Sequence, residues 1–182
     1  MESERYFAGD ITIVLAHGSR VPAKVTADEF YVEGKEICRI SLELGTEVRA
    51  AESEEDFFEA LKRIRLDLEK TGALLHCFGA SENVYPSGMQ KSMGPAILAY
   101  KMRIGYPTSH HDIVNIFEAD ETVVPSTVEQ QERFHRKWLD SLGPLRRSGV
   151  TVSDRYARTG KRSRTALCGR RCGRNSSNIR DS

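Results

Sequence analysis

The chain has 182 residues, 39% of them hydrophobic, which suffices for one domain with a buried core, since about 150 residues bury roughly two-thirds of their unfolded surface. The N-terminus lacks the apolar core of a secretory signal, and no apolar run approaches the roughly 20 residues of a membrane-spanning helix. We therefore expect a cytoplasmic protein with no membrane partner and with reduced thiols at its four cysteines, Cys38, Cys77, Cys168 and Cys172.

The net charge of +1 conceals two oppositely charged parts. Of the 27 Lys and Arg residues and the 26 Asp and Glu residues, 11 basic and 2 acidic residues follow residue 145. Residues 146–182 therefore carry a charge of +9, whereas residues 1–145, with 16 basic and 24 acidic side chains, carry −8. This division predicts a single acidic domain over 1–145, followed by a basic tail.

Short β-type segments fill the first 45 residues. The run Ile11–Ala16 is rich in β-branched residues and is followed by a turn. A second, tight turn is predicted at 33–35, and after it every second residue from Cys38 to Leu44 is apolar. Because this alternation is typical of a half-buried strand, the sequence predicts an antiparallel meander of about three strands.

A helix and a buried strand are predicted next. Ser53 opens a capping-box-like pattern of Ser-x-x-acid, and apolar residues recur at helical spacing from Phe57 to Leu68. Gly72 suits the end of this helix. The short apolar run Ala73–Gly79 favours a buried strand over a helix.

Two further helices and one strand are predicted in the second half. A helix is expected over 95–107, where Pro95 suits a first helical turn and Gly105 with Pro107 ends it. A strand follows at Asp112–Glu118, and a helix with a capping box at Ser126–Glu129 ends at Gly143. The resulting order, β-β-β-α-β-α-β-α, predicts an α+β fold with a small antiparallel or mixed sheet and about three helices.

The stretch from Gly79 to Pro95 shows neither helix nor strand periodicity, and unstructured connections of this length are usually functional or disordered. It does not match a phosphate-binding P-loop, because Gln90 rather than Gly precedes Lys91. Met89 lies four residues before Met93, so this pair also fits the core face of a short helical turn. The candidate partner-binding residues in this stretch are Glu82, Asn83, Tyr85, Met89, Lys91 and Met93.

Catalysis by a cysteine or a histidine is the main alternative. His76 and Cys77 are adjacent on the predicted strand, so their side chains point to opposite faces and cannot form a dyad. A small Cys/His-dependent hydrolase or transferase would therefore need one of them beside His17, His110 or His111. The motif G-x-S-x-G is absent, and we expect Cys77 to be a core residue.

No metal or cofactor is expected. H-E-x-x-H is absent, and Cys168-x-x-x-Cys172 lacks a partner pair, although histidines distant in the sequence can still meet in a fold.

The tail over 146–182 is rich in Arg, Ser and Gly, has no sustained periodicity and is expected to be disordered. It is either native or a foreign, frame-altered extension. Nucleic-acid binding through the tail is the third hypothesis for the function of the protein. It is weakened because Tyr156 is the only aromatic residue of the tail.

A family resemblance lies between Gly72 and Glu118. It rests on the segments G-A-L-L-H-C-F-G-A-S-E-N-V-Y-P-S-G-M, M-G-x-x-x-x-A-Y-K-M-x-x-G and D-I-V-N-I-F-E. Together they resemble the immunity proteins encoded beside polymorphic or contact-dependent growth inhibition toxins in bacteria. The resemblance implies a non-enzymatic inhibitor that binds one cognate toxin domain and blocks its active site. An acidic domain suits a basic toxin, such as a nuclease that holds phosphate groups.

Overall fold

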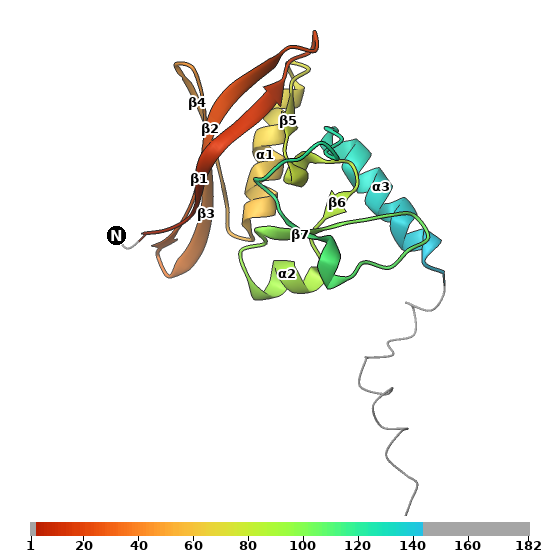
Figure 1. The fold of residues 1–182 in the computed structure, drawn as a ribbon. Helices are drawn as coiled ribbons and strands as arrows, with labels where there is room; N and C mark the ends of the chain where they lie inside the picture. The colour runs from red at the N-terminus through yellow and green to blue at the C-terminus, as the bar shows by residue number, and fades with distance from the viewer. Residues whose placement is uncertain (1–2, 144–182) are drawn as a thin grey trace, which may run out of the picture. The chain divides into compact units, whose positions relative to one another are not determined.

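The computed structural model describes residues 3–143, apart from the side chains of Ser92 and Met93. The expectations for the tail over 146–182 therefore lie outside the described residues. Residues 1–145 form one compact unit. Within the described part, a five-stranded sheet, a three-stranded sheet and three α-helices make an α+β fold, which confirms the predicted class (Figure 1).

The large sheet is antiparallel throughout, with the strand order β4-β3-β2-β1-β5. The predicted meander is confirmed, but it has four strands rather than about three. The additional strand, β4, has the sequence E-V-R-A-A-E-S, which has little apolar alternation, and it is ordered by pairing with β3. The five strands are β1 (Ser3–Val14), β2 (Arg20–Val32), β3 (Lys35–Leu44), β4 (Glu47–Ser53) and β5 (Leu74–His76).

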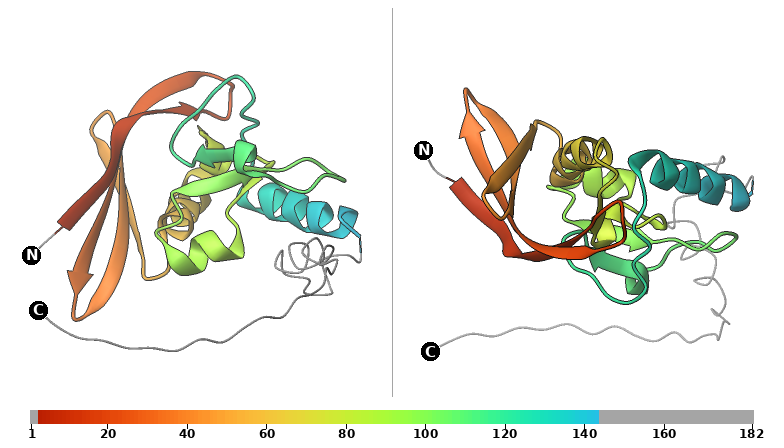
Figure 2. Two further views of the ribbon diagram at one scale, coloured as in Figure 1. Left: turned by 60° about the horizontal axis from the view of Figure 1, so that its bottom comes forward. Right: turned by 90° about the horizontal axis from the view of Figure 1, so that it is seen from above.

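Helix α1 (Phe57–Glu69) packs against the concave side of this curled sheet (Figure 2). The apolar residues at the predicted spacing, Phe57, Leu61, Ile64 and Leu68, are buried, and they form the core with the inward-facing residues of the strands. The predicted N-cap at Ser53 is wrong, because Ser53 ends β4. The carboxylate of Asp56 instead accepts a hydrogen bond from Glu59 N at 2.7 Å.

The Gly79–Pro95 stretch is structured. It contains most of the 3₁₀ helix η1 (Phe78–Ala80), then β6 (Val84–Tyr85) and α2 (Gly88–Met93). The helix predicted over 95–107 is wrong, because Leu98–Lys101 form strand β7, which pairs with both β6 and β8 (Ile113–Asn115). The pairing on both sides overrides the local helical pattern. The strand predicted at 112–118 is confirmed at β8, after the 3₁₀ helix η2 (His110–Asp112).

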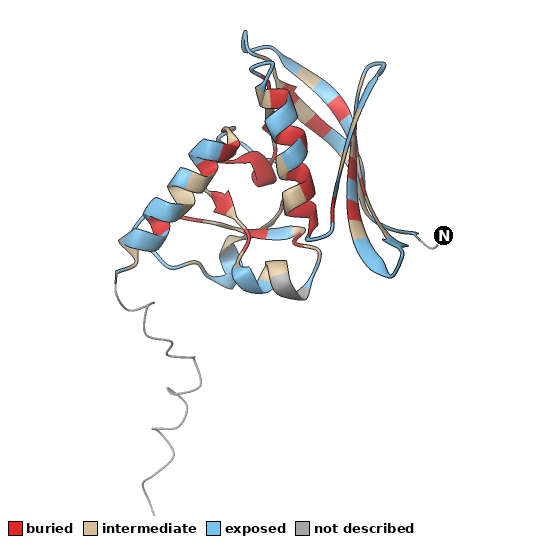
Figure 3. Ribbon diagram, turned by 180° about the vertical axis from the view of Figure 1, so that it is seen from behind, coloured by how far each residue is buried: buried red, intermediate tan, exposed pale blue. Residues whose placement is uncertain are grey.

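Helix α3 (Val128–Ser141) is confirmed near its predicted position, with a capping box one residue later than expected. The hydroxyl of Thr127 accepts from Gln130 N, and the Gln130 side chain accepts from Thr127 N. Ser126 is buried and donates to the carbonyl oxygen of Ala80 instead. Half of the residues of α3 are exposed, and three buried positions, Val128, Gln131 and Trp138, face the rest of the chain (Figure 3).

Candidate functional site

A buried guanidinium fixes the beginning of the Gly79–Pro95 stretch. Arg65 of α1 is only 2% exposed. It donates hydrogen bonds to Gly79 O at 3.0 Å, to Ser126 O at 3.1 Å and to the side-chain oxygen of Gln131. Burial lowers the pKa of Arg65. The cation is therefore held mainly by carbonyl oxygens, which join α1 to the segment before α3.

The amide of Gln131 completes this anchor from α3. Its Nε2 lies within hydrogen-bond distance of three carbonyl oxygens, Gly79 O at 3.1 Å, Ser81 O at 2.9 Å and Val84 O at 2.8 Å. An amide group has two N–H donors, so the three acceptors share them. These bonds hold the main chain from Gly79 to Val84 in one conformation, and thereby position the residue that follows.

That residue, Tyr85, lies where four elements meet. Its ring stacks on His135 of α3 with centroids 4.0 Å apart and an interplanar angle of 8°. It also meets the ring of Phe58 of α1 edge-on at 5.1 Å. Nζ of Lys91 on α2 lies 5.6 Å from the centroids of both Tyr85 and Phe58, and 4.0 Å from a carboxylate oxygen of Glu59. We call Phe58, Tyr85, Lys91 and His135 the Tyr85 cluster.

The cluster keeps His135 neutral around pH 7. Burial lowers the pKa of His135, and the nearby charges of Lys91 and Arg136 lower it further. A neutral imidazole stacks on the phenol ring of Tyr85 without placing a second cation beside Lys91. The cluster is therefore a packed aromatic platform, with Lys91 at its margin.

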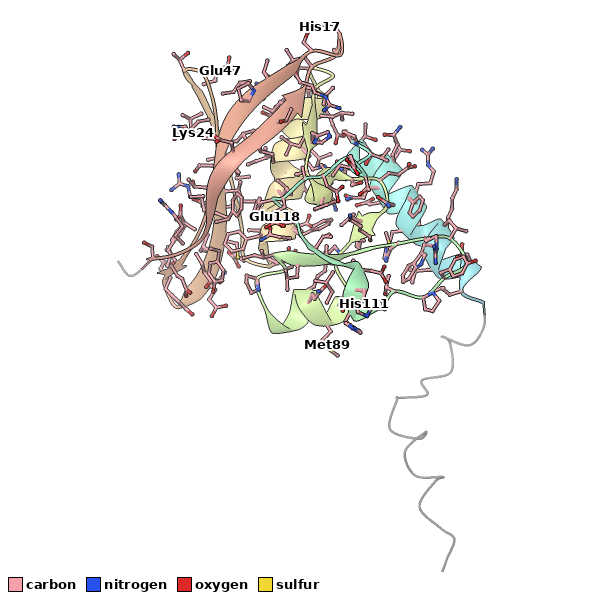
Figure 4. The ribbon with its side chains drawn as sticks, viewed as in Figure 1. His17, Lys24, Glu47, Met89, His111 and Glu118 are labelled. Carbon is pink, nitrogen blue, oxygen red and sulfur yellow. The ribbon has the colours of Figure 1, made fainter. Side chains whose placement is uncertain are left out.

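The sequence-predicted site residues are distributed over this region. Tyr85 and Lys91 meet in the Tyr85 cluster, and Met89, on the same short helix as Lys91, is 70% exposed (Figure 4). Glu82 and Asn83 are half-buried, and their main chains bond elsewhere, with Glu82 N donating to Val124 O and Asn83 O accepting from Met102 N. The side chain of Met93 lies outside the described residues.

A second exposed feature was missed by the sequence analysis. Residues 103–106 form a turn that α3 holds through two hydrogen bonds, from Trp138 Nε1 to Tyr106 O at 2.9 Å and from Gly105 N to Ser141 Oγ at 2.8 Å. The Tyr106 side chain is 56% exposed, with the guanidinium of Arg103 3.9 Å from its ring centroid. The sequence pattern predicts the end of a helix at this turn, and so gives no sign that its apolar residues form an exposed surface.

The groups proposed for the catalytic alternative lie apart or are inaccessible. Cys77 is fully buried, and burial raises the pKa of its thiol to about 11, so the thiol stays protonated at neutral pH. His17 and His111 lie far apart in the fold, at the top and near the bottom of the view in Figure 4. The ring centroids of His110 and His111 are 3.7 Å apart, and both residues are exposed on the 3₁₀ helix η2. This geometry offers no activated thiolate at Cys77.

Among residues 3–143, no three His, Cys, Asp or Glu side chains gather closely enough to hold a metal ion. No helix in the same range is long and apolar enough to cross a membrane. No protein-family model matches the chain, and a search of the curated proteins finds no match either.

Proposed function

We propose that the protein is an inhibitor of the immunity type, which binds a cognate bacterial toxin domain and covers its active site without catalysis of its own. The observation that carries this proposal is a set of exposed apolar side chains on α2, on α3 and on the 103–106 turn that α3 holds. We call this set the apolar face, and its members are Met89 on α2, Ile104 and Tyr106 on the 103–106 turn, and Leu139 on α3.

The apolar face suits protein recognition more than small-molecule chemistry. Helix α3 lies on the side away from the large sheet, and α2 lies below the lower end of α1 (Figure 1). Aromatic residues, Met and Arg are the types that are enriched at protein interfaces, and Tyr106 with Arg103 and Met89 supplies all three. Because α3 and the Tyr85 cluster already hold these elements in place, little conformational entropy is lost when a partner binds.

The charge of residues 1–145 supports a basic partner. Their net charge of −8 creates a field that accelerates encounter with a positively charged domain and disfavours acidic competitors. The resemblance over Gly72–Glu118 points the same way, since immunity proteins act by binding one toxin.

The test uses the reading frames that flank this gene in the source genome, one of which we expect to encode a toxin domain. We expect the full-length protein to bind the purified toxin domain, abolish its activity at a one-to-one ratio and restore growth of a strain that expresses it. The double variant Met89→Ala with Tyr106→Ala should weaken binding by about 100-fold, as expected when two interface anchors are truncated.

A matched control separates interface loss from general loss of apolar surface. Val48 on β4 is also an exposed apolar residue, and it lies outside the apolar face. Val48→Ala should therefore bind the toxin domain as well as the unaltered protein does. A toxin domain that stays fully active in the presence of excess protein would overturn the proposal, and equal binding by the double variant would place the interface elsewhere.

A further inference from the structure

The large sheet ends in a strand with an open edge. β4 is the last strand in the order β4-β3-β2-β1-β5, and within residues 3–143 no strand pairs with its other side (Figure 1). It pairs with β3 without a register shift, and it contains neither proline nor lysine. Bulges, prolines and lysines are three of the devices by which proteins protect an open edge. The edge of β4 is therefore a template on which a further strand can pair.

Alternate residues of β4 direct their main-chain groups toward this edge. The hairpin to β3 closes with a two-residue turn, Gly45-Thr46, so the residues that flank the turn form a hydrogen-bonded pair. Hydrogen-bonded and non-hydrogen-bonded pairs alternate along an antiparallel ladder. The odd-numbered residues of β4 therefore bond to β3, and the outward main-chain groups are those of Val48, Ala50 and Glu52.

One face of α1 lies beside the same edge. Nη1 of Arg63 donates to the outward carbonyl oxygen of Glu52. Four residues later, Asp67 accepts from the guanidinium of Arg49 on β4 at 2.5 Å. Leu66 shares this helical face, since residues three and four apart are neighbours on a helix, and its side chain is 46% exposed. The open edge is thus flanked by a basic, an apolar and an acidic side chain.

We propose that this edge pairs with the same edge of a second copy of the chain, about a two-fold axis at Ala50. In this register Val48 lies opposite Glu52 of the second copy, and Arg49 lies opposite Ala51 of the second copy. The outward main-chain groups of both strands then meet, and no like charges are opposed. A two-fold axis at Arg49 would instead place two arginines opposite each other.

The flanking face of α1 is self-complementary about the same axis. Its contacts with β4 run in opposite order along helix and strand, so the axis brings Arg63 of one copy beside Asp67 of the other. Among the described residues, Oδ1 of Asp67 is contacted only by the exposed Lys70, at 3.3 Å, so it can accept the incoming guanidinium. Leu66 lies between these charges and meets Leu66 of the second copy. Such a contact is isologous and closes at two copies.

The inference goes beyond the proposed function and is independent of it. No member of the apolar face lies on β4 or α1, so each copy in the dimer keeps that face for a toxin domain. Inhibition without dimerisation would remove only this inference, and dimerisation without inhibition would remove only the proposed function.

The test is sedimentation velocity of the full-length protein over a range of concentrations. We expect the average mass to rise from the chain mass of 20.5 kDa toward twice that value. Leu66→Glu places two carboxylates beside the axis and should raise the Kd of the dimer by about tenfold or more. The matched control is Leu98→Glu on β7, where the leucine is 45% exposed and lies outside this interface, and it should leave the Kd unchanged.

A charge exchange tests the contact between the helices. Arg63→Asp and Asp67→Arg each oppose like charges across the axis, so each variant alone should dimerise about tenfold more weakly. An equimolar mixture should form the heterodimer, because both cross-axis contacts then join opposite charges, and native mass spectrometry distinguishes it by mass. A full-length protein that stays monomeric at every concentration, a mixture without heterodimer, or equal Kd values for Leu66→Glu and Leu98→Glu would overturn the inference.

Discussion

Arg65 and Gln131, 66 residues apart in the chain, donate to the same carbonyl oxygen, that of Gly79, at 3.0 and 3.1 Å. The two side chains also bond to each other. Through this shared acceptor, α1 and α3 fix the beginning of the segment that leads to the Tyr85 cluster. The arrangement is a buried polar network in which each member depends on the others.

Removal of the guanidinium should therefore be costly. We expect Arg65→Ala to lower the free energy of unfolding by about 3 kcal/mol or more, because it leaves buried carbonyl oxygens without donors and opens a cavity. Urea unfolding followed by circular dichroism measures the loss. Arg136→Ala, which removes an exposed arginine from α3, is the matched control and should change stability little. Similar midpoints for the two variants would show that the network does not stabilise the fold.

Gly79 is required for the close approach of η1 to α1. A Cβ atom at this position would lie 2.5 Å from Leu61 Cδ2 and 3.0 Å from the carbonyl oxygen of Ile116. Because the backbone of Ile116 cannot give way as a flexible side chain would, Gly79→Ala should destabilise the protein by about 1–3 kcal/mol.

The control for this substitution is Gly88→Ala. A Cβ at Gly88, the first residue of α2, would meet no atom within 4 Å, and its φ angle is not in the left-handed region. Alanine favours helix over glycine, so we expect thermal unfolding of Gly88→Ala at the same temperature or slightly higher. A Gly79→Ala protein as stable as Gly88→Ala would contradict the close approach.

Burial of His135, whose ring stacks on Tyr85, should make the free energy of unfolding depend on pH. Burial lowers the pKa of His135 in the folded protein below its usual value of 6.5, so in acid the unfolded chain binds a proton that the folded chain resists. Stability from this residue is therefore complete above pH 6.5 and falls as the pH drops below it, until the folded state is also protonated. His135→Phe keeps a ring against Tyr85 and should flatten the difference in urea midpoint between pH 5.5 and 7.5. If the difference in urea midpoint stays the same in His135→Phe, the pH dependence of stability comes from other titratable groups.

Cys77 should be unreactive in the native protein. Its thiol is fully buried, and burial raises its pKa to about 11, so iodoacetamide at pH 7.5 should modify it only after the protein is unfolded in urea. Peptide mapping by mass spectrometry distinguishes Cys77 from the other cysteines. Rapid alkylation of Cys77 in the folded protein would restore it as a candidate nucleophile and favour the hydrolase or transferase alternative.

Local periodicity accounts for the parts of the fold that were predicted from the sequence. The alternation in β3 and the helical spacing in α1 and α3 depend on neighbouring residues, and these elements are where they were expected. Strands β4 and β7 are different, because their partners rather than their own patterns determine them. Leu98–Lys101 illustrates the point, since it has a helix-like sequence but is held between two strands.

The same limit applies to the candidate site. Tyr85, Met89 and Lys91 could be selected from composition, because a loop rich in aromatic and sulfur-containing residues favours binding. The exposed position of Tyr106 could not be predicted from the sequence, since its carbonyl oxygen is fixed by Trp138, 32 residues further along the chain.

The position of Gln131 has a consequence for synthesis of the protein. The carbonyl oxygens of Ser81 and Val84 receive their hydrogen bonds from a residue made about fifty positions later. During translation, the residues of the meander and α1 are made before this amide, since the chain is synthesised from its N-terminus. The segment that carries Tyr85 therefore reaches its final conformation only after α3 has emerged from the ribosome.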